Sequence, residues 1–373
     1  MELYLIALTI IFNYKVSKLN ILINTLSKSE IIDLFNGDLV AINMKHNIIT
    51  EDIFNKLNNQ EKLQETLDKA KFIIEASNRE GISIITIYDE IYPERLKVIK
   101  DFPVVLYAKG DIRLLKKSKK SIACVGTRNI SNYGVYMIKS LIPIFVKEQF
   151  IIISGLALGV DSEAHRECIE NKGKTIAVLA SGLDAVYPKS NNTLVNQILD
   201  TAGLLISEYP VGESAIKHRF IDRNRIVSGL SNGVLLIECK EKSGSMHTVN
   251  FAIAQDKFIM YPRITSYDFE NTGAKSLKYR KIGMEIKEDV DCYKIINKLG
   301  YNVESKKQLE LYNIIRNSFK SLSIKNINCV VEEFNEVNKN RIDEDFRNLI
   351  NRLDISEDEL LYGLKELIIF GNR

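Results

Sequence analysis

The stretch that decides the fold is residues 150–165, FIIISGLALGVDSEAH. Its first five residues, Phe150–Ser154, form an apolar run rich in isoleucine, which is typical of a buried strand. Two glycines, Gly155 and Gly159, follow the run, and the segment Ser162–Asn171 is then long enough for a helix. A strand, a glycine-containing loop and a helix in this order predict one step of a parallel α/β sheet.

The same alternation extends on both sides of this stretch. We expect further strands at Ile122–Val125, Thr175–Ala180, Leu204–Ser207, Val234–Glu238 and Phe258–Tyr261. Between them lie segments long enough for crossover helices, including Tyr136–Lys147, Asn191–Leu199 and Thr248–Gln255. Strands rich in Val, Ile and Leu with helical crossovers favour a parallel sheet covered on both faces. In such sheets, ligands bind at the loops beyond the carboxyl ends of the strands.

Both ends of the chain have few glycines and prolines and read as helical. All six prolines lie between Pro93 and Pro262, and 12 of the 19 glycines lie between Gly110 and Gly244. We therefore expect a helical N-terminal domain over 1–80, the α/β domain over 81–290 and a helical C-terminal module over 300–373. The elements expected at the two ends are helices Leu3–Phe12, Val16–Leu26 and Glu61–Asn78, a strand Ile82–Ile87, and helices Lys306–Phe319, Ile342–Leu353 and Glu357–Leu367. The last three helices are compatible with a helix-turn-helix or with a bundle for packing or dimerisation.

The composition excludes several classes of protein. Of 373 residues, 45% are hydrophobic and 27% charged, which is close to the average of soluble globular proteins and excludes a mainly disordered chain. With 51 Lys and Arg against 48 Asp and Glu, the net charge is only +3, so a nucleic-acid surface has to be a local patch. Five cysteines without a CxxC pair favour reduced thiols over disulfides or a cysteine-based zinc site.

The first apolar run predicts neither a membrane span nor a signal peptide. Leu3–Phe12 is shorter than the roughly 20 residues that cross a bilayer. It follows Glu2 in place of a basic segment, and no small-residue cleavage site comes after it. We therefore expect a cytoplasmic protein without a membrane partner.

The first two strands end in loops that could hold an anion. Gly126 and Arg128 follow the first strand. Glycine lets backbone N–H groups come close to a phosphate, and the N-terminus of the next helix and the arginine guanidinium also attract it. The spacing matches neither a GxGxxG nor a Walker A loop, and a tight turn with a surface arginine is the alternative. The second strand ends in Ser154, Gly155 and Gly159. The pair Asp161 and His165 could hold a metal or exchange a proton, but a cap and a packed histidine fit the spacing better.

Three later segments add cations and small polar residues. The first contains Lys189 and Asn191, and the last, at 242–248, contains Ser243 and Gly244. Between them, residues 217–225 carry four cations against one carboxylate, a local charge of 4 − 1 = +3 that favours phosphate binding. The candidates in this segment are Lys217, Arg219, Arg223, Asn224 and Arg225. No GxSxG or HExxH motif is present, so we expect no catalytic residue, metal or cofactor, and a nucleotide or nucleic-acid backbone as ligand.

Several motifs in a fixed order resemble the DprA (Smf) family of DNA-processing proteins. They are CVGTR at 124–128, SGLALGVDSEAH at 154–165, GLDAVYPKSN at 182–191, GLLISEYP at 203–210, RNRIVSGLS at 223–231 and KSGSMHT at 242–248. The resemblance implies an extended Rossmann-like domain that binds and protects single-stranded DNA and helps to load a RecA-type recombinase during natural transformation. It also implies DNA contacts by Arg128, Lys189 and residues 223–225. The resemblance further implies a homodimer formed through the Rossmann-like domain, a SAM-like N-terminal domain and a winged-helix-like C-terminal module, which Ile355–Gly371 resembles. The family has no established enzyme activity.

The sequence departs from this family at a few positions. Leu158 stands where the family has an arginine, and the glycine-containing hairpin expected near residues 10–16 is absent. The alternative function is that of a nucleotide-sensing or nucleotide-hydrolysing protein related to the phosphoribohydrolases. Those enzymes carry a PGGxGTxxE motif, whereas residues 241–250 (EKSGSMHTVN) lack its glutamate, and with it an obvious general acid or base.

Overall fold

A computed structural model describes residues 1–301 of the chain, except 119, 265–270 and 288. Residues 1–292 pack together as one unit, and the residues from Tyr293 onward belong to a second. The three helices predicted between Lys306 and Leu367 lie outside the described residues. The division into domains at 1–80, 81–290 and 300–373 therefore stays a prediction.

Within the described residues, nine strands form one sheet in the order β1-β2-β6-β5-β4-β3-β7-β8-β9. The strands β3 to β9 run parallel to one another, whereas β2 pairs antiparallel with both β1 and β6. The parallel α/β core predicted from the sequence is therefore confirmed, and the antiparallel strands β1 and β2 are added at one side of it. The bounds are β1 Ser83–Thr86, β2 Val105–Gly110, β3 Ser121–Val125, β4 Ile151–Ser154, β5 Thr175–Leu179, β6 Leu204–Ser207, β7 Gly233–Leu236, β8 Phe258–Pro262 and β9 Met284–Ile286.

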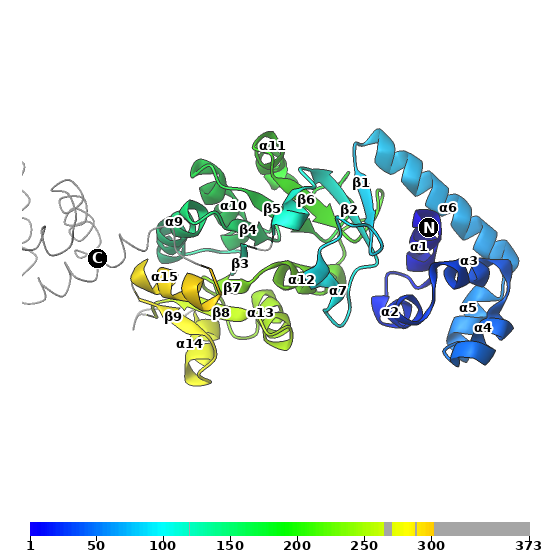
Figure 1. Ribbon diagram of the computed structural model, residues 1–373. Coiled ribbons are helices and arrows are strands. Elements are labelled where there is room, and N and C mark those ends of the chain that lie inside the picture. The colour runs from blue at the N-terminus through cyan, green and yellow to red at the C-terminus, as the bar shows by residue number, and fades with distance from the viewer. Residues whose placement is uncertain (119, 265–270, 288, 302–373) are drawn as a thin grey trace, which may run out of the picture. The chain divides into compact units, whose positions relative to one another are not determined.

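Helices cover both faces of this sheet (Figure 1). Helices α9 (Asn132–Lys147), α10 (Val160–Glu170) and α11 (Asn192–Asp200) lie on one face, and α12 (Lys217–Leu230) and α13 (Gly244–Ala254) lie on the other. Because both faces are covered, every residue of β3, β4 and β5 is buried, which explains their continuous apolar sequences. The shorter elements are α7 (Glu94–Lys97), α8 (Leu114–Lys117), the 3₁₀ turn η1 (Lys189–Asn191), α14 (Thr272–Tyr279) and α15 (Asp289–Lys298).

Six helices precede the sheet, and their core is continuous with that of the sheet. The first, α1, is buried along Leu5–Thr9, and it contacts α6 as well as β1 and β2. The helices predicted near α1, α2 and α6 are confirmed, and α3 to α5 are additional to them. The bounds are α1 Glu2–Ile11, α2 Val16–Thr25, α3 Lys28–Asn36, α4 Leu39–His46, α5 Glu51–Leu57 and α6 Gln60–Arg79. Of the helices in the described part of the chain, none has the length and apolar character needed to cross a membrane.

One element differs in kind from its prediction. The sequence places the cationic segment 217–225 among the loops near the strand ends, whereas in the structure it forms the first turns of α12. A helix turns its side chains about 100° per residue, so neighbouring cations of this segment point in different directions. Lys217 is exposed, whereas Arg219, Arg223 and Arg225 are buried. The local charge of this segment is therefore not presented on one surface.

Candidate nucleic-acid interface

The topology creates a crevice beside the central strand β3. From β3 the chain builds outward through β4, β5 and β6, and it then returns to place β7 on the other side of β3. At such a reversal of strand order the neighbouring loops diverge, and a crevice opens beyond the carboxyl ends of the strands. A pocket of about 430 Å³ lies there, lined by the loops that follow β3, β4 and β7 and by one side of α12.

The loops of this crevice approach each other so closely that two positions require glycine. Gly159 has a φ of +76°, and a Cβ built on it would overlap the carbonyl oxygen of Thr127 and lie 2.6 Å from the carbonyl carbon of Arg128. A Cβ at Gly155 would lie 2.5 Å from the guanidinium of Arg223. These glycines therefore hold the loops together, whereas a Cβ at Gly244 would meet nothing within 4 Å.

Three helices begin at the crevice, and two of their N-termini already hold a carboxylate of the chain itself. At α9, Glu238 accepts hydrogen bonds from the backbone N–H and the hydroxyl of Ser131, at 2.6 and 2.7 Å. At α10, Asp161 accepts backbone hydrogen bonds from Gly155 and Ala157, at 3.1 and 3.4 Å. The first turn of α13 contains no acidic residue and has no side-chain cap. Its positive end is thus the one of the three that suits an external anion.

Two arginines give the pocket different kinds of positive charge. Arg223 is 4% exposed, and its guanidinium donates to the carbonyl oxygens of Gly155, at 2.6 Å, and of Val178. Burial raises the pKa of Asp161, and the nearby Arg223 opposes that rise. Arg223 therefore forms the charged floor of the pocket, while Arg128 is exposed at its rim.

An aromatic surface lies next to Arg128. The guanidinium of Arg128 is 5.5 Å from the ring centroid of Phe220, and the ring of Tyr187 meets Phe220 edge-on at 5.6 Å. Tyr187 is 53% exposed, and Phe220 also lines the pocket. Solvent-accessible rings beside an exposed cation are the combination on which nucleic-acid bases stack while a phosphate is bound.

The structure brings half of the predicted site residues into this pocket. These are Gly126, Arg128, Gly155, Arg223, Asn224, Ser243 and Gly244. Lys189 is exposed on the loop of Tyr187, and Lys217 is exposed at the start of α12, but neither lines the pocket. The geometry gives no support to contacts with a ligand by Ser154 and Asn191, because both are buried. The hydroxyl of Ser154 donates to Cys124, and the amide of Asn191 donates to Leu156.

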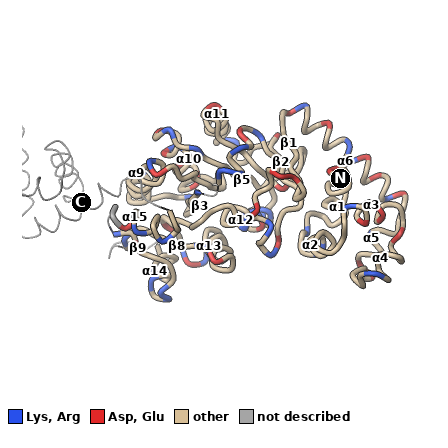
Figure 2. The backbone as a smooth tube through the Cα atoms, in the orientation of Figure 1, with Lys and Arg blue, Asp and Glu red and all other residues tan. Residues whose placement is uncertain are grey.

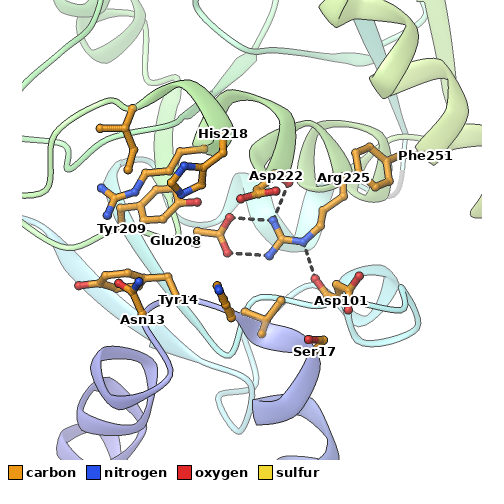
Figure 3. Close-up of a pocket in the computed structure, with 14 residues that line it drawn as sticks. Asn13, Tyr14, Ser17, Asp101, Glu208, Tyr209, His218, Asp222, Arg225 and Phe251 are labelled. Atoms are coloured by element: carbon orange, nitrogen blue, oxygen red, sulfur yellow. Dashed lines mark hydrogen bonds and ion pairs between the residues drawn. The ribbon is translucent and has the colours of Figure 1, made fainter.

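Arg219 and Arg225 lie away from the crevice. The guanidinium of Arg225 forms two hydrogen bonds with the carboxylate of Glu208, at 2.7 and 2.6 Å, and both residues are buried (Figure 3). Arg219 pairs with Glu213 at 2.7 Å and lies 4.3 Å from the ring centroid of Tyr209. Their donors are thus used inside the fold, and the expectation that they contact DNA finds no support in their positions.

The structure also shows which residues the sequence reasoning left out. Phe220 and Tyr187 lie within the segments 217–225 and 182–191, but neither is among the predicted site residues. The absence of tryptophan is the signal that could have found them, because any stacking surface must then use other rings. Along the described part of the chain, Lys and Arg are interspersed with Asp and Glu (Figure 2).

The Asp161–His165 pair of the sequence has a structural role. His165 is fully buried, its Nδ1 lies 2.6 Å from the hydroxyl of Thr175, and its Nε2 has no hydrogen-bond partner among the described residues. Burial first, and then the charges of Arg223 and Arg166, lower its pKa to about 3. No cluster of metal-ligating side chains occurs among the residues that the structure describes.

His165 is expected to make the fold sensitive to acid. In the unfolded chain this residue has a pKa near 6.5, so it binds a proton as the pH falls from 7 toward 3, whereas the folded chain stays unprotonated there. The free energy of unfolding therefore falls as the pH falls. The loss from this residue is about 2 kcal/mol between pH 7.5 and 5. Urea unfolding of the wild type and His165→Gln at both pH values measures it, and the variant should show a smaller difference. An equal pH dependence in the two proteins would contradict this assignment.

Comparisons with known proteins give the family. The model of the family described as DNA recombination-mediator protein A matches residues 83–292. The chain is 38% identical over 209 residues to the DNA processing protein DprA of Bacillus subtilis, an alignment that covers 56% of this chain and 70% of that protein. It is 41% identical over 172 residues to the DprA of Streptococcus pneumoniae, covering 46% and 60%.

Solved structures agree with this match. The X-ray structure of DNA processing protein A from Streptococcus pneumoniae has a TM-score of 0.57 at 30% identity, covering 72% of this chain and 97% of that one. DNA processing protein A from Helicobacter pylori, a structure concerned with its single-stranded DNA binding mode, has a TM-score of 0.52 at 29% identity, covering 59% and 98%. The matched region contains the whole sheet and every residue of the crevice. The chain belongs to the DNA recombination-mediator protein A family.

Proposed function

We propose that this chain binds single-stranded DNA in the crevice beside β3. The observation that carries the proposal is the α13 N-terminus, which holds no acidic residue of its own and faces the same pocket as Arg128 and Phe220. A phosphate fits between the backbone N–H groups at Gly244 and the Arg128 guanidinium. The neighbouring base then stacks on Phe220 or Tyr187. The relative from Helicobacter pylori, for which a single-stranded DNA binding mode is described, supports this choice of ligand.

The proposal extends to what the bound DNA is used for. We infer a binding protein that hands single-stranded DNA to a RecA-type recombinase during DNA uptake and recombination, and that acts as a homodimer. The description of the family as a recombination mediator supports the first part. Recombinase filament formation on coated DNA, measured with and without this protein, tests the first part, and sedimentation of the purified chain tests the second.

Alanine at Arg128 or Lys189 is expected to weaken single-stranded DNA binding. Each loses one phosphate contact, so affinity falls by about tenfold and the slope of log affinity against log salt falls by about 0.7–1. Fluorescence anisotropy of a labelled oligonucleotide, at several salt concentrations and beside a duplex of equal length, measures both quantities.

Arg113→Ala is the matched control. Arg113 is exposed and pairs with Asp111. The backbone N–H of Asp111 donates to Gly203, which precedes β6, so Arg113 lies near the amino ends of the parallel strands, whereas the crevice lies at their carboxyl ends. This variant should bind DNA like the wild type. Unchanged affinity and salt slope in both Arg128→Ala and Lys189→Ala would refute the proposed interface.

A further inference from the structure

A second cavity, of about 580 Å³, lies on the other side of α12 (Figure 3). It is lined by residues 13–17, which comprise part of the turn between α1 and α2 and the start of α2, by the residues that follow β6 and by the start of α12. Helix α12 therefore separates two cavities. Phe220, Arg223 and Asn224 face the DNA crevice, whereas Arg219, Asp222 and Arg225 line the second cavity. A movement of this one helix changes both.

The first turn of α12 is weak by its own sequence. Its N-cap is Ile216, which provides no side-chain cap, and the turn contains no acidic residue. It carries Lys217 and Arg219 at the end of the helix where the dipole disfavours cations. Without a cap or an acid, the order of this turn depends on contacts with the rest of the fold.

Those contacts centre on Arg219. Its guanidinium donates to the carboxylate of Glu213 at 2.7 Å and to the carbonyl oxygen of Ser214 at 2.8 Å. It also lies beside two rings, 4.3 Å from the centroid of Tyr209 and 5.3 Å from that of Tyr14. Phe220, the ring proposed to stack a base, is the next residue along the chain.

Tyr14 comes from the N-terminal helices, and the turn that presents it is strained. Asn13 and Tyr14 have φ values of 50° and 57°, a left-handed conformation that non-glycine residues rarely adopt in succession. The hydroxyl of Tyr14 donates to Glu213 at 3.0 Å, and its ring meets that of Tyr209 edge-on at 5.5 Å. Strain of this kind persists only where surrounding contacts hold it, which marks the turn as a candidate for a functional role.

We propose that Tyr14 is a positioning residue for the DNA crevice. Through Glu213 and Arg219 it fixes the first turn of α12, and so it holds Phe220 against Arg128. Docking of residues 13–17 against α12 and binding of single-stranded DNA are then coupled, although Tyr14 lines the other cavity and does not line the crevice. This inference rests on the proposed function of the crevice.

Three variants and one exchange measurement test the coupling. Tyr14→Ala should lower the affinity for a labelled single-stranded oligonucleotide by about fivefold or more, within the usual range of coupling between sites. Tyr14→Phe keeps the ring beside Arg219 but removes the hydroxyl that donates to Glu213, so its affinity should lie between those of the wild type and Tyr14→Ala. Phe72→Ala removes a 61% exposed ring from α6 and serves as the control for losing an aromatic side chain in the N-terminal helices.

Because coupling is reciprocal, bound DNA must also slow hydrogen exchange in the turn that carries Tyr14. The amides of Tyr14 and Lys15 donate to Thr9 and Phe12, and their hydrogen exchange in the wild type should slow when oligonucleotide is added. This measurement needs no variant, so it holds even if Tyr14→Ala folds poorly. Unchanged exchange in DNA-bound wild type, or wild-type affinity in Tyr14→Ala, overturns the coupling. If the wild type does not bind the oligonucleotide at all, it is the proposed function of the crevice that fails.

Discussion

Alanine at Arg225 is expected to destabilise the folded chain by about 3–5 kcal/mol. Arg225 is 5% exposed, and its guanidinium donates to the backbone carbonyl oxygens of Asp101 and Asp222, both at 2.6 Å, as well as to Glu208. Removing it leaves the Glu208 carboxylate buried without its partner (Figure 3). The Glu208 carboxylate then carries a buried charge that neither water nor a cation compensates, and this desolvation accounts for most of the lost free energy of unfolding.

Urea unfolding followed by circular dichroism measures this loss. Replacing both partners, with Arg225→Met and Glu208→Leu in one chain, should recover most of the stability, because no uncompensated charge remains. Lys217→Ala, at an exposed cation two turns earlier in the same helix, should change stability by less than about 0.5 kcal/mol. If Arg225→Ala unfolds like the wild type and yet no longer binds DNA, Arg225 acts on the ligand directly and its structural role is wrong.

The strands β3 to β8 could be predicted to within two residues, because each is an apolar run with a glycine or a polar residue at its end or within the next two positions. Burial on both faces leaves this signature in the sequence itself. Strand β2, at the antiparallel edge, and the short strand β9 carried weaker signals and were not predicted. The loops that form the crevice were found for the same reason as the strands, since they follow them directly.

The roles of individual site residues were harder to predict. Arg223 and Arg225 are two residues apart in one cationic run, yet Arg223 lines the crevice and Arg225 lines the cavity on the other side of α12. Which of them faces the crevice depends on how the helix is rotated about its axis. The contact between Ser131 and Glu238 joins residues 107 positions apart. It decides that α9 is closed to an external anion, and no local pattern in the sequence reveals it.

The glycines of the crevice allow packing to be separated from ligand contact. Gly159→Ala is expected to cost about 3 kcal/mol or more, because the residue has a φ of +76° and its new methyl group would meet the backbone at Thr127 and Arg128. Backbone atoms cannot rotate away as a side chain does. Either the loop after β3 shifts, taking Arg128 with it, or the fold loses that energy, so DNA binding should fall together with stability.

Gly244→Ala should do the opposite. Gly244 is the first residue of α13, its φ is not positive, and an added Cβ meets nothing within 4 Å, so stability should stay equal or rise by about 0.5–1 kcal/mol. If a phosphate sits on the N–H groups there, the methyl group keeps it away, and affinity for single-stranded DNA should fall several-fold. Thermal unfolding and anisotropy on the same two variants measure both effects. Wild-type DNA affinity in Gly244→Ala would show that the DNA backbone does not approach the N-terminus of α13, since no loss of folding could hide the contact.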